Sequence, residues 1–146
     1  MANSSEVAIC NLLYRYAEIM DSGDFAAAAE LFRHARLVLD PTNDVSVGAE
    51  GILRVWTDMV IRYPDGTPRT KHVTTNPIVD VDEEAGTATC RSSYTVFQQT
   101  DTLPLQPIIA GRYHDRFERV DGTWRFCARD YSLVDMVGDV SHHLRP

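Results

Sequence analysis

The chain has 146 residues, with 14 basic against 21 acidic side chains and 44% apolar residues. This length and composition predict one compact domain spanning residues 1–146. The net charge of −7, with arginines scattered rather than clustered, argues against nucleic acid as a partner. Apolar runs fall well short of the roughly 20 residues of a membrane span, and residues 1–5 lack signal-peptide features. We therefore expect a cytoplasmic protein that does not bind membranes.

The first sixty residues carry helical periodicity. An amphipathic helix is predicted over 7–20, and Gly23 can cap its end. Asp24 is a typical N-cap for a short helix through residue 32, and 36–40 has the pattern of a short strand. A third helix is predicted from the apolar stripe Ile52, Val55, Trp56, Met59 and Val60.

Beyond Gly66 the pattern becomes that of long strands. Runs at 70–82, 87–99, 108–120 and 123–134 alternate with turn signals, which predicts antiparallel neighbours in a twisted, curved sheet. Helices followed by strands are typical of an α+β fold, in which we expect the three N-terminal helices to pack on the curved antiparallel sheet and close a central cavity. The tail at 138–146 is expected to be loosely held.

Motifs for nucleotide binding, zinc proteolysis and nucleophile-elbow hydrolysis are absent from the sequence. Cys10, Cys90 and Cys127 are far apart and odd in number, which indicates reduced thiols rather than disulfides or a zinc site. Adjacent His142 and His143 point apart and no third ligand is evident, so we expect no metal.

Two polar residues mark the end of the first helix. Tyr16 lies on the apolar stripe, where it is either a core tyrosine with a satisfied hydroxyl or a site residue. Asp21 opposes the helix dipole, at a cost of about 0.3–1 kcal/mol. It is therefore either an exposed turn residue or a carboxylate that a partner holds in place.

His72 lies in the first long strand and shares a face with Thr74 and Asn76. This face is either a solvent-exposed polar stripe or part of a site. If a carboxylate lies beside His72, it selects one ring tautomer and makes the histidine a usable general base. The sequence pattern alone does not place Asp21 beside it.

The last hairpin carries further candidates. Arg129 and Tyr131 share one strand face and can donate hydrogen bonds to a substrate oxygen, or they form a rim salt bridge and a core aromatic. His114 points away from Tyr113 and is not a candidate. We also predict that Trp56, Tyr94 and Tyr113 bind substrate.

Three segments together resemble the SnoaL-like branch of the nuclear transport factor 2-like superfamily, over nearly the whole chain. They are Tyr16 to Phe25, Thr70 to Pro77, and Gly111 to Arg119 with Asp121 to Phe126. The pattern is most similar to scytalone dehydratase, bile-acid 7α-dehydratase and hexachlorocyclohexane dehydrochlorinase. These share an aspartate at the end of the first helix and a histidine on the first long strand, which are the places of Asp21 and His72.

The resemblance implies a cone-shaped α+β barrel. It also implies a cofactor-independent dehydratase, or a related lyase or isomerase, that acts on a hydrophobic cyclic molecule. It implies His72 as base, Asp21 as its orienting partner and Tyr16 as hydrogen-bond donor to the departing or enolising oxygen. A polyketide-type cyclase stays open, as does a non-catalytic binding or assembly module of the dioxygenase β-subunit type. The resemblance also implies a homo-oligomer.

Overall fold

A computed structural model describes residues 2–146. Three helices precede most of the strands: α1 (Ser5–Ser22), α2 (Phe25–Glu30) and α3 (Ala49–Met59). The strands are β1 (Arg36–Asp40), β2 (Val45–Val47), β3 (Thr70–Asp82), β4 (Thr87–Gln98), β5 (Gln106–Val120), β6 (Thr123–Asp130) and β7 (Val134–Val137). The α+β prediction is confirmed.

The helix ends follow from local capping. Ser4 accepts a hydrogen bond from the Val7 amide at the start of α1, and Gly23 closes that helix in the left-handed conformation, with φ of 83°. Asp24 caps α2, as predicted. The predicted apolar face of α3 is too broad, because Val55 and Met59 are 37% and 41% exposed. Of that stripe, only Ile52, Trp56 and Val60 are buried.

One curved, unclosed sheet forms the body of the protein, with strand order β2-β1-β6-β5-β4-β3 and β7 paired to β5. The pairs from β3 to β6 are antiparallel, as predicted, whereas β1 pairs with β6 in parallel. The predicted strand 123–134 is wrong in one respect, because β6 ends at Asp130 and a separate strand, β7, begins at Val134. The Asp130 side chain accepts bonds from the Ser132 amide and hydroxyl, and this turn interrupts the strand. The short strand β2 was not predicted.

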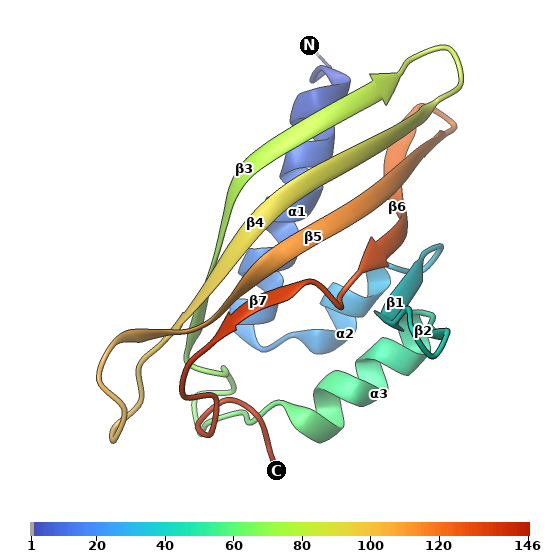
Figure 1. Cartoon of the computed structure of the whole chain (residues 1–146). Coiled ribbons are helices and arrows are strands. Elements are labelled where there is room, and N and C mark those ends of the chain that lie inside the picture. The colour runs from blue at the N-terminus through green and yellow to red at the C-terminus, as the bar shows by residue number, and fades with distance from the viewer. Residues whose placement is uncertain (1) are drawn as a thin grey trace.

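The helices lie on one side of this sheet (Figure 1). α1 runs along the sheet and packs mainly on β3, while α2 and α3 pack together beneath it. Apolar residues from the helices and from the inward face of the sheet form a single core. β3 is the last strand in the order, so only one of its edges is paired with another strand.

A bulge in β6 sets which of its side chains point inward. Phe117 pairs with Phe126 but Arg116 pairs with Ala128, so Cys127 is the extra residue. As a result Phe126 and Arg129, three residues apart, are both buried. The simple alternation that the sequence suggested would have placed Cys127 and Arg129 on one face.

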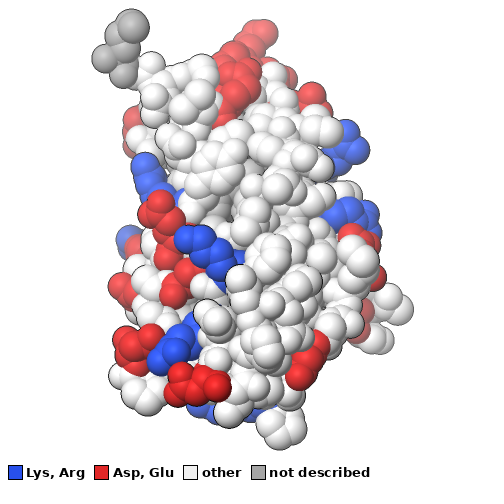
Figure 2. Space-filling model, turned by 90° about the vertical axis from the view of Figure 1, so that its left-hand side faces the viewer, with Lys and Arg blue, Asp and Glu red and all other residues white. Residues whose placement is uncertain are grey.

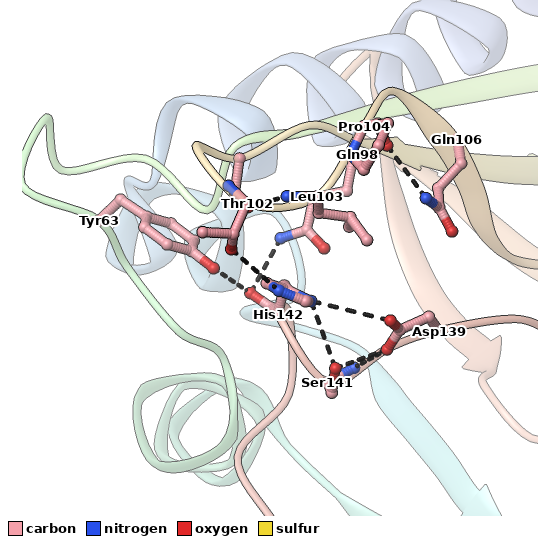
Figure 3. A network of polar contacts seen from close by, with 10 residues as sticks. Tyr63, Gln98, Thr102, Leu103, Pro104, Gln106, Asp139, Ser141 and His142 are labelled. Atoms are coloured by element: carbon pink, nitrogen blue, oxygen red, sulfur yellow. Dashed lines mark hydrogen bonds and ion pairs between the residues drawn. The ribbon is translucent and has the colours of Figure 1, made fainter.

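The tail at 138–146 is held by main-chain contacts, contrary to the expectation of a loose segment. The Gly138 amide donates to the Ile108 carbonyl at 2.7 Å, and the His143 carbonyl accepts from the Ile61 amide at 2.8 Å. Leu144 forms a β-bridge with Val60. Polar side chains from other segments also bond this tail, which its composition does not reveal (Figure 3).

On the face drawn in Figure 2, acidic and basic side chains are interspersed beside a broad uncharged band. No helix among residues 2–146 is long and apolar enough to span a membrane.

Candidate functional site

Asp21, in the last turn of α1, is held by β3. Its carboxylate accepts hydrogen bonds from the Thr70 hydroxyl at 3.0 Å and from the backbone amide of His72 at 2.9 Å. A third contact of 2.6 Å joins Oδ1 to Nδ1 of the His72 ring. These donors offset the unfavourable helix dipole. Asp21 is therefore a partly buried carboxylate with assigned partners and not a free turn residue.

This contact determines the chemistry of the His72 ring. An ionised carboxylate only accepts hydrogen bonds, so Nδ1 must carry the proton that faces Asp21. In the neutral ring the lone pair is then on Nε2. The His72 side chain is only 9% exposed, against 17% for Asp21. The pair thus presents a single, sheltered basic nitrogen.

Tyr16 connects this pair to the interior. Its ring centroid lies 6.2 Å from that of His72, in an edge-on arrangement, and its hydroxyl accepts a 2.8 Å hydrogen bond from Tyr131. Burial raises the pKa of both phenols well above the ordinary value. Both hydroxyls therefore keep their protons at neutral pH.

The other predicted site residues surround Tyr16. Trp56 and Tyr113 lie 6.2 Å and 6.1 Å from it, centroid to centroid, and Tyr94 stacks on Tyr113 at 4.4 Å. The structure thus brings together all eight predicted site residues, although they come from α1, α3, four strands and, for Tyr131, the segment after β6.

Arg129 lies on the other side of Tyr16 and is fully buried. Its guanidinium carbon is 4.5 Å from the Tyr16 ring centroid and 3.8 Å from that of Tyr113. Nε and Nη2 donate to the two carboxylate oxygens of Asp115 at 2.7 and 3.0 Å. Nη1 is buried without a hydrogen-bond partner. Among residues 2–146, Nη1 is thus the nitrogen of this guanidinium that has no acceptor.

The pKa values of this pair are both displaced. Burial raises the pKa of the Asp115 carboxyl by more than Arg129 lowers it. Burial lowers the pKa of Arg129, but Asp115 and neighbouring tyrosines raise it well above the ordinary value. We describe the pair as ionised, because both carboxylate oxygens meet the guanidinium in bidentate geometry.

Three polar residues near this site were not predicted. Asp115 comes two residues after Tyr113, so both side chains point to the buried face of β5. A charged residue at a core position requires a partner, and this pattern could have identified Asp115 from the sequence. Thr70 is the first residue of the predicted strand and lies two residues before His72. His143 comes from the tail, and no sequence pattern predicted it as a site residue. Its ring is close enough to His72 and Asp21 for both to shift its pKa.

A surface pocket of about 550 Å³ opens beside the pair, between α1 and β3. Asp21 and His72 both contribute to its lining, together with Ala17, Lys71 and Thr74 among others. Of the eight predicted site residues, only Asp21 and His72 line this pocket.

A metal has no evident place here. No group of three or more histidine, cysteine, aspartate or glutamate side chains within residues 2–146 is arranged to hold one. The His142 ring instead lies near Thr102, Ser141 and Asp139 (Figure 3).

A protein-family model described as a SnoaL-like domain matches residues 2–130. A comparison with curated proteins finds no match. Among solved structures, a candidate scytalone dehydratase from Novosphingobium aromaticivorans is 23% identical, with 91% of this chain and 85% of that chain covered and a TM-score of 0.68. The β subunit of a candidate aromatic-ring-hydroxylating dioxygenase from the same organism is 17% identical, with 97% of each chain covered and a TM-score of 0.69.

A protein of unknown function with a cystatin-like fold, from Nostoc punctiforme, has a TM-score of 0.73 at 19% identity, with 96% of this chain and 99% of that chain covered. At these identities the structural matches establish the fold alone, which is the cystatin-like fold.

Proposed function

Because this chain belongs to the SnoaL-like domain family, we propose that it is a cofactor-independent dehydratase, or a related lyase or isomerase, with His72 as general base. The observation that carries the proposal is the 2.6 Å contact between Asp21 and Nδ1 of His72. It commits Nε2 to the role of proton acceptor, and Asp21 stabilises the imidazolium that forms.

The proposed substrate is a hydrophobic cyclic molecule with an acidified C–H bond. His72 removes the proton, and the C–H electron pair becomes the new double bond. In a dehydration, the neighbouring C–O bond breaks and the departing hydroxyl takes a proton to leave as water. In an isomerisation, the C–H electron pair forms the C=C bond of an enol while the π pair of the carbonyl moves onto its oxygen. The C=O bond then re-forms as the proton returns at another carbon.

Tyr16 is the proposed donor to the departing or enolising oxygen. It already accepts a bond from Tyr131, so its own proton is available for an acceptor. Arg129 offers its unpartnered Nη1 to the same developing charge, in surroundings where such a contact is strong. Trp56, Tyr94 and Tyr113 supply the apolar surface of the proposed binding site.

The test is a screen of cyclic hydroxy ketones and halides, followed by variants of the pair. General-base assistance contributes about 10²- to 10⁴-fold, and His72→Ala should lower kcat/KM by at least that factor. Asp21→Asn should also lower it. His114→Ala is the matched control, because His114 is exposed on the outer face of the sheet. Near-normal turnover by His72→Ala would remove this mechanism.

A second candidate is a non-catalytic assembly module. The strand β7 favours it, since Val134, Met136 and Val137 are 43%, 67% and 62% exposed. Copurification with a larger subunit, together with the absence of turnover in the screen, would favour this function over the enzyme.

A further inference from the structure

His143 is a buried histidine that neither the predicted site nor the proposed mechanism uses. It is 9% exposed, and its Nδ1 atom is enclosed without a hydrogen-bond partner. Leaving a buried polar nitrogen unpaired is unfavourable, so such a group requires an explanation. The atom lacks a partner among residues 2–146, although its residue is firmly placed.

The surrounding tail fixes the position of His143. Its own carbonyl accepts from Ile61, and its amide donates to Val140 at 3.0 Å. The neighbouring His142 carbonyl accepts from the Tyr63 hydroxyl and from the Gln98 side chain (Figure 3). Residues on both sides are therefore anchored to the body of the domain, which preorganises the ring.

The same contacts bring the tail beside Asp21 and His72. Gln98 bonds the tail and also pairs with Thr70 across β3 and β4. Thr70 in turn donates to Asp21. Figure 1 shows the tail returning to the end of the sheet where β3 begins. The tail is thus connected to Asp21 through Gln98 and Thr70, and the His143 ring is near enough to His72 and Asp21 for both to shift its pKa.

The ring is uncharged at neutral pH. The pKa of His143 is lowered to about 4, mainly by burial and secondly by the nearby His72, against a smaller opposing effect of Asp21. A neutral imidazole carries one donor and one acceptor nitrogen. It can hydrogen bond to a carbonyl or hydroxyl oxygen without adding a charge beside His72.

We propose that His143 is a substrate-contacting residue, which forms a hydrogen bond from its unpartnered ring nitrogen to an oxygen atom of the molecule bound at the His72–Asp21 pair. This proposal rests on the proposed function for the location of the ligand. It assigns to the site a specificity for oxygenated over plain hydrocarbon rings. It also makes the C-terminal segment a part of the binding site.

The test compares two probes that differ by one oxygen, the cyclic ketone 1-tetralone and the hydrocarbon tetralin, by titration calorimetry. His143→Phe keeps a ring and removes both nitrogens, and it should weaken 1-tetralone binding about 3- to 10-fold, the worth of one neutral hydrogen bond, while leaving tetralin binding unchanged. His143→Asn restores a donor and should recover part of the affinity. His142→Ala is the control and should bind as the wild type does.

Stability separates this role from a structural one. Because His143→Phe removes an unpaired buried nitrogen, it should unfold at an equal or higher urea concentration than the wild type while binding 1-tetralone more weakly. Equal 1-tetralone affinity in His143→Phe and wild type, or no saturable binding by the wild type, would overturn the proposal. His72→Ala should still bind 1-tetralone, so loss of turnover in that variant tests the proposed function separately.

Discussion

The Asp115–Arg129 pair should be the most sensitive polar contact in the protein. Asp115→Ala leaves a guanidinium buried among aromatic rings without its counter-charge. Both side chains are 0% exposed, and two hydrogen bonds of 2.7 and 3.0 Å are lost. Breaking a buried pair of this kind costs about 3–5 kcal/mol. For a domain of this size the melting temperature should fall by about 6–20 °C.

The chain contains a matched control for this prediction. Glu118 and Arg125 form a 2.8 Å pair on the same two strands, but their side chains are 35% and 34% exposed. Glu118→Ala should therefore cost no more than about 1 kcal/mol. Urea unfolding followed by circular dichroism measures both variants.

A double variant tests the cause. Asp115→Leu with Arg129→Met removes both charges and should recover most of the stability lost in Asp115→Ala, because the penalty comes from the uncompensated charge. Equal costs for Asp115→Ala and Glu118→Ala, or a double variant no more stable than Asp115→Ala, would refute the reasoning.

Three further predictions concern histidine, glycine and tyrosine residues. Because the folded-state pKa of His143 is depressed to about 4, the unfolded chain binds a proton more readily below about pH 6.5, and the free energy of unfolding should fall by about 3 kcal/mol between pH 6.5 and pH 4. Urea unfolding at about pH 7 and pH 4 should show a shallower acid loss in His143→Phe than in His142→Ala. In thermal unfolding, Gly23→Ala should destabilise the protein far more than Gly122→Ala. Both glycines have positive φ, but of the two only Gly23 has backbone, the carbonyl of Gly66, where a Cβ would lie. Equal losses of stability in the two variants would contradict this prediction. In an ultraviolet titration, the three tyrosines around Arg129 should form no tyrosinate until the protein unfolds at alkaline pH, because burial raises their pKa values.

Much of the fold follows from local patterns in the sequence. The bounds of β3, Thr70–Asp82, are those predicted, because period-2 alternation and the following turn act within a few residues. The capping signals at Gly23 and Asp24 were equally local. The contact of Asp21 with His72 joins residues 51 positions apart, and only the family resemblance suggested it.

Features that depend on tertiary packing were not predictable in this way. The bulge at Cys127 shifts the phase of β6 by one residue, and no composition signal marks it. The position of His143 depends on the fit of the tail against α3 and β4, whose contacts exist only in the assembled domain.

The carboxylate of Asp21 has a consequence for the sheet as well as for the ring. It accepts a hydrogen bond from the His72 backbone amide at the edge of β3 that pairs with no other strand of residues 2–146. Asp21 thus takes the place of one hydrogen bond that a neighbouring strand would make. A free strand edge is a template for pairing with another chain, and natural proteins block such edges. Asp21→Ala would open this edge at His72, and concentration-dependent self-association should then accompany any loss of activity. A single side chain would in that case protect the protein against misassembly and prepare its base for reaction.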